Sequence, residues 1–477
     1  MSDLRIAGIG AYTPQLRIAA EEFEDAWGQF SGAGISEKAV PDADEDALTM
    51  AYEATRRALD ASGYTGSDIA SLSLATTTPP MAEEDLTARL RSMLSTPNDV
   101  TTRTLTGSTR AGGQALADAL DIGPWDDGVG VVVVSDCPVG TPESDVEQAA
   151  GAGAVSLVLD SAGPGAITDS ATAVEPYPGT RFREHGEAKT TRLGVTAYER
   201  NVFNTLLQTA ANDLDSNRSS IDAAAVQSPD GKRPYRVASA LGVETSDVAT
   251  ADTVNALGDT GAASAFFGLV KALQADAERV LLATYGSGAG ATLFVIEGQE
   301  IPVNAVLEGE IQLTYAAYLR RRGEITSGAP AGGGAYVSIP SWQRTIPQRH
   351  RLRAGQCSAC GALNFPAEGA CNDCGNRSDE FEPVTLPGTG VVEAVTTIAQ
   401  GGAPPEFVEQ QSRSGPFVSA IVAFDGPNGE RSVSVPVQVL NSVSDPVEIG
   451  TPVEATIRRQ YEQEGVIRYG IKVKRVH

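Results

Sequence analysis

The feature of this sequence that most constrains its fold is a repeat within about the first 300 residues. Residues 46–78 show a helical pattern, then a Ser-Asp-Ile link, then an apolar strand, and residues 202–231 follow the same order. Each copy continues through a turn rich in Gly and Thr, an Ala/Leu helix and a second apolar strand. The strand ends of the two copies lie 58 and 59 residues apart, at Thr78 and Asp136 and at Ser228 and Ser287. The pattern predicts two copies of one α/β unit.

The alternation of strands and helices also predicts where a ligand would bind. It favours an α/β fold with mostly parallel sheets and helices on their faces, in which ligands bind beyond the carboxyl ends of the strands. Small and polar residues stand at these ends, at Thr76 to Thr78, Gln227-Ser228 and Gly286 to Gly288. The segment LTGSTRAGGQAL is predicted to form a turn that leads into a helix, and the turn carries two side-chain hydroxyls, those of Ser108 and Thr109. Such a turn can hold an anion, a thioester oxygen or a nucleophile, although glycine and serine also occur in ordinary loops.

Four of the five cysteines lie close together near residue 365. They form two Cys-x-x-Cys motifs, at Cys357, Cys360, Cys371 and Cys374. Each motif directs two thiolates at one point, so the two motifs complete a tetrahedral site that favours zinc, with iron or a vacant site as the alternative. Because four protein thiolates leave no open position, the metal is expected to be structural. This clustering indicates a metal site and not a disulfide framework.

The part of the chain that follows residue 325 has a different character. A glycine-rich run, TSGAPAGGGA, reads as a flexible linker and precedes the cysteines. Five strand-like runs follow the cysteines and predict a small barrel of the OB type. The predicted organisation is two halves of one α/β domain, a linker, a zinc ribbon and an OB barrel, at residues 1–165, 166–325, 326–340, 341–385 and 386–477.

Charge and composition narrow the class of partner. The chain has 36 basic and 61 acidic residues, a net charge of −25, which argues against nucleic acid and an anionic membrane even though the stretch WQRTIPQRHRLR is basic. Few of the basic residues are lysine, and the acidic excess is spread along the chain, as in proteins of salt-loving microbes. No apolar stretch reaches the length of a membrane span, and the start of the chain does not resemble a signal peptide. We therefore expect a cytoplasmic, halophilic protein.

Several segments carry a resemblance to a known family. The first 325 or so residues resemble the thiolase superfamily, in particular the archaeal hydroxymethylglutaryl-CoA synthases. The segments that carry this resemblance are VQSPDGK, ALGDTGAAS, LLATYGSGAG and TYAAYLRRRGEI. The rest, especially IPQRHRLRAGQCSACGALNFP, resembles the zinc-ribbon and OB proteins of the domain-of-unknown-function-35 type that accompany such enzymes. The resemblance implies a duplicated thiolase-like fold, an acyl-CoA (a coenzyme A thioester) as ligand, a homodimer, and a partner thiolase or synthase.

The resemblance also implies catalytic positions, and the sequence departs from the family at each of them. The family uses a cysteine that takes the acyl group, a histidine beside the second thioester and a glutamate for the condensation. Thr109 stands at the cysteine position, with Ser108 beside it, and Gln227 stands at the histidine position. Thr77 stands at the glutamate position, and Asp259 replaces an asparagine. We therefore expect the condensation chemistry to be lost or rebuilt.

The residues expected to bind coenzyme A lie in two segments. Lys232 occupies the lysine position of the family's Ser-Pro-x-x-Lys motif and is expected to meet a phosphate of the ligand, although it could equally be a solvated lysine. Gly286, Ser287 and Gly288 follow an apolar strand and are expected to line the pantetheine or thioester.

Three functions remain open. The first is a synthase-like acyl-CoA-binding protein of isoprenoid or lipid metabolism that acts with a partner enzyme. The second is an aldolase or lyase of the kind found among cysteine-less thiolase relatives, for which Tyr198 and Tyr285 are candidate acid/base residues. The third is a scaffold that uses the ribbon and barrel. Cys137, the one cysteine outside the ribbon, ends a strand and is a further candidate nucleophile, although most free cysteines are structural.

Overall fold

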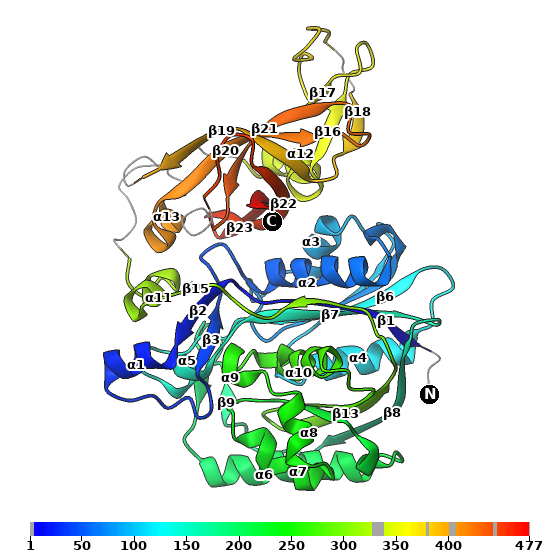
Figure 1. Cartoon of the computed structure of the whole chain (residues 1–477), viewed down its shortest axis with the longest axis vertical. Helices are drawn as coiled ribbons and strands as arrows, with labels where there is room; N and C mark the ends of the chain where they lie inside the picture. Colours follow the sequence, from blue (N-terminus) through cyan, green and yellow to red (C-terminus); the bar gives the residue numbers. More distant parts are fainter. Residues whose placement is uncertain (1–3, 327–337, 378–380, 400–406, 442–445, 477) are drawn as a thin grey trace. The chain divides into compact units, whose positions relative to one another are not determined.

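The structure is a computed structural model that describes residues 4–326, 338–377, 381–399, 407–441 and 446–476. The chain forms two compact units (Figure 1). One contains most of the chain up to Tyr318, and the other contains the chain from Leu319 together with the short segments Asp42–Glu45 and Ser92–Ser95. Most of the predicted linker, 326–340, lies outside the described residues.

Within the described residues, the first unit contains a ten-stranded mixed sheet. The strand order is β11-β12-β13-β8-β1-β7-β6-β4-β5, and β14 pairs with β1. The strands are β1 Arg5–Tyr12, β4 Ile69–Ala75, β5 Thr101–Leu105, β6 Val129–Asp136, β7 Gly153–Asp160, β8 Gly165–Val174, β11 Ala223–Val226, β12 Arg279–Gly286, β13 Gly290–Glu297 and β14 Val303–Val306. Strands β1 and β8 share only the pairs Arg5 with Ala166 and Ile6 with Gly165, so the sheet folds there into two layers.

The prediction of mostly parallel pairing is wrong for the middle of this sheet. Parallel pairs join β4 to β5 and β6, and β11 to β12, where helices provide the crossovers. Strands β7, β1, β8, β13 and β12 pair antiparallel to one another. The reason is visible at β12 and β13, which are joined by Ser287, Gly288 and Ala289 alone. A connection this short can return only antiparallel to the strand before it.

The predicted repeat is confirmed by the order of the elements. Helix α2 (Ala47–Ser62) precedes β4, and α6 (Thr196–Asn212) precedes β11, in each case with a 3₁₀ turn between helix and strand. Helix α4 (Ala111–Ile122) then precedes β6, and α10 (Ser264–Gln274) precedes β12. Helices α4 and α10, the Ala/Leu helices of the sequence, therefore occupy equivalent positions in the two copies of the repeat.

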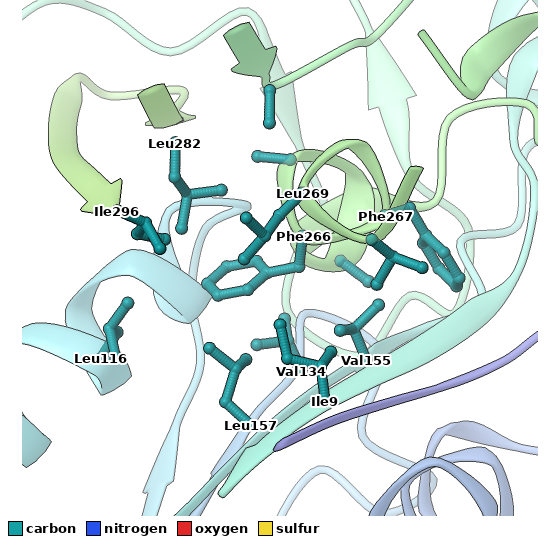
Figure 2. Packing of buried hydrophobic residues seen from close by; sticks show 14 of the residues in the cluster. Ile9, Leu116, Val134, Val155, Leu157, Phe266, Phe267, Leu269, Leu282 and Ile296 are labelled. Atoms are coloured by element: carbon teal, nitrogen blue, oxygen red, sulfur yellow. The ribbon is translucent and has the colours of Figure 1, made fainter. Parts of the chain in front are cut away.

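Helices α4 and α10 form the centre of the first unit. Both lie between the two layers of the sheet, while α2 covers one outer face and α6 to α8 cover the other (Figure 1). Figure 2 shows Phe266 and Leu269 of α10 packed with Val134 of β6 and Leu157 of β7. Small and apolar residues, with Ala111, Gly112, Ala115 and Leu116 of α4 and Ala265, Phe266 and Leu269 of α10 fully buried, suit the two helices to this position.

The remaining elements of the first unit surround this core. Strands β15, β2 and β3 form a three-stranded sheet, and strands β9 and β10 form a small separate ladder. These elements are β2 Leu16–Ala19, α1 Ala20–Trp27, β3 Glu37–Val40, α5 Asp145–Ala149, β9 Arg181–Phe182, β10 Thr191–Arg192, α7 Arg233–Leu241, α8 Thr245–Thr250, α9 Val254–Leu257 and β15 Ile311–Gln312. The helices α3 Leu86–Met93 and α11 Tyr315–Arg321 begin in the first unit and end in the second.

The second unit contains a helix, a small ribbon and a closed barrel. Helix α12 (Ile339–Arg351) leads into a three-stranded sheet in the order β17-β16-β18. The barrel closes in the order β19-β20-β21-β23-β22, as predicted for an OB-type fold. The elements are β16 Arg353–Gln356, β17 Leu363–Asn364, β18 Glu382–Thr385, β19 Thr389–Ile398, α13 Val408–Ser414, β20 Phe417–Asp425, β21 Ser432–Val439, β22 Pro452–Gln463 and β23 Val466–Arg475. None of the described helices is both long enough and apolar enough to cross a bilayer.

Candidate functional site

A pocket lies in the first unit beyond the carboxyl ends of β11 and β12. Thr109, Gln227 and Ser287, three of the residues predicted from the sequence, line it. They come from the turn before α4, from the end of β11 and from the loop after β12. Tyr285, a candidate acid/base residue, lines it as well. The structure thus brings together residues that are far apart in the sequence.

The turn before α4 is held by a hydrogen bond from Thr109. Its Oγ1 donates to the backbone oxygen of Tyr285 at 2.7 Å, and the residue is buried. Ser108 packs beside Gly286, where an added Cβ would lie 2.8 Å from the Ser108 Cβ. Gly286 is therefore required for this close approach of turn and strand. Because the Thr109 hydroxyl proton is already donated, this oxygen can only accept a further hydrogen bond.

Gln227 and Asp259 both form hydrogen bonds with the backbone of Gly261. The Gln227 Nε2 donates to the Gly261 oxygen at 2.8 Å, and the Gly261 N–H donates to Asp259 Oδ1 at 3.0 Å. The other oxygen of Asp259 forms an ion pair with Arg181, which lines the pocket. Asp259 is buried, does not line the pocket and is already neutralised.

Thr77 does not line the pocket, and its hydroxyl binds a buried carboxylate. Asp136, at the end of β6, accepts hydrogen bonds from the hydroxyls of Thr76, Thr77 and Thr78 at 3.0, 2.8 and 2.9 Å. It also accepts from the backbone N–H of Ala262 at 2.7 Å. These bonds join the ends of β4 and β6 to the turn before α10, so Thr77 has a structural role.

An ion-pair network on one wall of the pocket was not predicted from the sequence. Glu199, in the first turn of α6, accepts hydrogen bonds from Arg192 at 3.1 Å, Arg233 at 2.9 Å and Thr180 at 2.6 Å. Burial alone would raise the pKa of Glu199, but the bonds from Arg192 and Thr180 and the charge of Arg192 lower it to about 2. Asp230 lies 3.8 Å from Arg192 and adds a second negative charge. The guanidiniums are therefore largely neutralised by carboxylates.

The residues predicted to bind coenzyme A occupy different positions. Lys232 is exposed at the start of α7 and does not line the pocket, whereas its neighbour Arg233 does. The Ser287 Oγ accepts from the backbone N–H groups of Thr180 and Arg181 at 2.9 and 3.1 Å and so anchors the segment that supplies Arg181. Gly288, in the same loop, has a φ of +125°, which favours glycine.

The two candidate tyrosines also differ in position. Tyr285 lies edge-on to Phe203 with ring centroids 4.9 Å apart. Burial raises the pKa of Tyr285 to about 12, against the opposing charge of Arg233, so its phenol keeps its proton at neutral pH. Tyr198 does not line the pocket, and its hydroxyl donates to the Pro178 oxygen at 3.2 Å.

The four ribbon cysteines form a metal-binding cluster in the second unit. The sulfur atoms of Cys357, Cys360, Cys371 and Cys374 all lie within 4.8 Å of one another. In each motif a backbone N–H, from Gly361 or Gly375, donates to the oxygen of the first cysteine at 2.7 or 2.9 Å. Both glycines have a positive φ near +70°, so the tight turn depends on them. The Asn364 amide donates to the Cys371 sulfur at 3.6 Å and helps to orient it.

Known proteins resemble the first unit in sequence. The hydroxymethylglutaryl-CoA synthase of Pyrobaculum neutrophilum is 30% identical over 353 residues, which cover 68% of this chain and 98% of that protein. The chain belongs to the hydroxymethylglutaryl-CoA synthase family. The synthase of Caldivirga maquilingensis is 29% identical, over 66% of this chain and 97% of that protein. The predicted resemblance to the archaeal synthases is confirmed.

Solved synthase structures share the fold, and family models match the second unit. A HMG-CoA synthase complexed with CoA gives a TM-score of 0.62 at 16% identity, over 71% of this chain and 94% of that one. MvaS in complex with 3-hydroxy-3-methylglutaryl coenzyme A gives 0.58 at 17% identity, over 70% and 95%. The model for the ChsH2 rubredoxin-like zinc ribbon domain matches residues 344–380, and that for the ChsH2 C-terminal OB-fold domain matches residues 383–458. The chain is thus a synthase-family domain joined to a ribbon and barrel.

Cys137 lies outside the pocket of this synthase-family domain. It follows Asp136, and its backbone N–H donates to the Thr78 hydroxyl at 2.9 Å. Burial raises the pKa of the Cys137 thiol to about 12, a hydrogen bond with Thr78 partly offsets this, and the charges of Asp46 and Asp136 raise the pKa further. A thiol that keeps its proton is a poor nucleophile.

We expect Cys137 to resist alkylation in the native protein. At pH 8 an ordinary thiol is partly ionised, whereas a thiol with a pKa near 12 is almost entirely protonated, so iodoacetamide should react at least about 100-fold more slowly. Peptide mass spectrometry of native and denatured protein would measure both rates. Equal labelling in the two states would show that the thiol is ionised and accessible.

Proposed function

We propose that the first unit binds a coenzyme A thioester in the pocket lined by Thr109, Gln227, Tyr285 and Ser287. The observation that carries the proposal is that these polar groups converge beyond the carboxyl ends of β11 and β12, where α/β sheets bind ligands. Membership of the synthase family supports it, as do the solved neighbours bound to CoA and to 3-hydroxy-3-methylglutaryl coenzyme A. The protein would serve isoprenoid or lipid metabolism.

We further propose that the family's cysteine, histidine and glutamate have been replaced, so that the protein forms no acyl-enzyme. Thr109 has an alcohol in place of a thiol, and its proton is donated to a backbone oxygen. Gln227 cannot act as a base, Asp259 is paired with Arg181, and Thr77 is bound to Asp136. Catalytic residues that act together lose most of their effect when any one of them is replaced. Acyl transfer would therefore depend on a partner thiolase or synthase.

Binding of coenzyme A thioesters is testable by calorimetry at high salt. We expect acetyl-CoA and acetoacetyl-CoA to bind the full chain, and mass spectrometry to find no acyl adduct at Ser108, Thr109 or Cys137. Lys232→Ala should weaken binding about two- to fivefold if its ammonium meets a phosphate. Arg236→Ala, an exposed cation on the same helix, is the matched control and should change binding little.

Two outcomes would contradict this proposal. A stable acyl adduct on the unmodified protein would identify a working nucleophile and make the chain an acyltransferase. No binding of any thioester would favour the alternative that the chain is a scaffold acting through its ribbon and barrel.

A lyase or aldolase is a second candidate, favoured by the position of Tyr285. Its phenol lines the pocket and holds its proton at neutral pH. It could give that proton to the carbanion formed as the carbon–carbon bond breaks, and its phenolate could then take the proton of the 3-hydroxyl group as that oxygen becomes a carbonyl. Tyr285→Phe should then reduce cleavage of a 3-hydroxyacyl-CoA at least about 100-fold with little effect on binding. Tyr198→Phe is the matched control. Liquid chromatography of the thioester products would measure cleavage by the two variants. Undiminished cleavage by Tyr285→Phe would show that this tyrosine takes no part in the mechanism.

We propose zinc as the metal of the ribbon. Four thiolates fit a tetrahedral zinc ion and leave no position for substrate, so the ion would be structural. Elemental analysis should find about one zinc per chain. Cys357→Ser should release it and unfold the ribbon while the first unit stays folded, as limited proteolysis would show. Cys137→Ser is the control and should retain the metal. Absence of zinc from protein purified without a chelator would refute the proposal.

A further inference from the structure

We infer that the pocket selects thioesters whose acyl group is uncharged and excludes those whose acyl group carries a carboxylate. The arginines that line the pocket are already balanced by carboxylates of the chain itself, and Glu199 is the residue that determines this specificity. The inference rests on the proposed function, since it assumes that the acyl group of a coenzyme A thioester enters the pocket.

Among the described residues that line the pocket, the charged ones are Arg181, Arg192, Arg233 and Glu199. Three guanidiniums on their own would make the pocket a site for anions. Each of them, however, forms an ion pair within the first unit. Arg181 pairs with Asp259, whose side chain is only 3% exposed. An anion that approached Arg181 would therefore meet a guanidinium that already has a buried carboxylate as its partner.

Arg192 and Arg233 share two carboxylates. Their Nη2 atoms lie 3.1 and 2.9 Å from the same oxygen of Glu199, Oε2. Their guanidiniums also lie 3.8 and 3.7 Å from Asp230 Oδ2. Together with the pair formed by Arg181, the cluster contains three guanidiniums and three carboxylates, so its charges sum to zero.

The shared arginines cannot turn toward a ligand without a cost in free energy. The Glu199 side chain is 5% exposed, and a buried carboxylate that loses its partners is strongly destabilising. Arg233 is also held from a second side, because its Cζ lies 5.7 Å from the centre of the Phe203 ring. Burial alone would raise the pKa of Glu199, but the hydrogen bonds from Arg192 and Thr180 lower it to about 2. Glu199 therefore stays charged at neutral pH.

A carboxylate on the ligand would gain little in this pocket. It must lose its hydration to enter, and an excess of positive charge is needed to offset that loss. Here the attraction of the guanidiniums is opposed by the repulsion of Glu199, which lines the same pocket. An uncharged acyl group loses far less hydration. It can contact apolar surface on Phe203 and Pro229, and Tyr285 keeps a phenolic proton that it can donate to a carbonyl oxygen.

The test compares acetoacetyl-CoA with malonyl-CoA by calorimetry of the full chain at pH 7. The two acyl groups have the same length, and a carboxylate oxygen of malonyl stands in place of the methyl group of acetoacetyl, so the ligands differ in charge at nearly constant shape. High salt screens the long-range repulsion from the net charge of −25. We expect acetoacetyl-CoA to bind at least about tenfold more tightly than malonyl-CoA.

Glu199→Gln assigns the preference to this residue. Glutamine keeps the length of the side chain and an oxygen for the two guanidiniums, but it removes the negative charge and leaves the cluster positive. The ratio of the two affinities should then shift at least about tenfold in favour of malonyl-CoA. Glu297→Gln is the matched control, because Glu297 also pairs with an arginine, Arg279 at 3.1 Å, but does not line the pocket. It removes the same charge from the chain and should keep the full preference.

Each outcome decides the inference. Equal affinities for the natural chain, or tighter binding of malonyl-CoA, would show that the arginines still accept a ligand carboxylate. Either result overturns the inference and leaves the proposed function intact, whereas no binding of either thioester overturns both. An unchanged ratio in folded Glu199→Gln overturns the assignment to Glu199.

A second variant covers the case in which Glu199→Gln does not fold. Asp230→Asn removes the other carboxylate that Arg192 and Arg233 share, and the Asp230 side chain is more exposed than that of Glu199. The affinity ratio should shift in the same direction, by a smaller factor because Asp230 lies farther from the guanidiniums. An unchanged ratio in this variant overturns the role of the charge balance.

Discussion

The fold of the first unit depends on the close packing of α4 and α10 between the two layers of its sheet. An added Cβ at Gly112 of α4 would lie 2.6 Å from the Phe266 ring of α10, and one at Gly268 would lie 3.0 Å from Ala225 of β11. Glycine at these positions lets a helix approach its neighbours without steric conflict. The two crossover helices therefore bring both halves of the repeat into one core, and their N-terminal ends define where a site can form.

The pocket follows from this arrangement. Thr109 lies just before α4, while Gly261 lies just before α10 and holds Gln227, so one side chain from each half reaches the same cavity. Asp136 joins the two halves by accepting hydrogen bonds from Thr77 and from the turn before α10. Buried polar groups are costly unless paired, and here most of them are paired with the backbone. The unpaired Oε1 of Gln227 is notable against this background.

The sequence predicts the repeated elements, the crossover helices, the ribbon and the barrel, because these leave local patterns of apolar residues, glycine and cysteine. It does not predict the antiparallel centre of the sheet, since pairing partners far apart in the chain leave no local pattern. It also does not predict the arginines of the pocket. Arg181 and Arg192 lie on two-residue strands without periodicity, and their ion pairs with Asp259 and Glu199 leave no pattern in the sequence.

The site shows why family membership does not determine chemistry at a conserved fold. The resemblance places a histidine where Gln227 stands, and a neutral imidazole can present a donor on one nitrogen and an acceptor on the other. The glutamine donates one N–H of its amide to Gly261 and keeps its second N–H and its acceptor oxygen. A pocket whose guanidiniums are already neutralised by Glu199 and Asp259 has little free positive charge to stabilise an oxyanion. The same backbone can therefore present different polar groups at one position of the pocket.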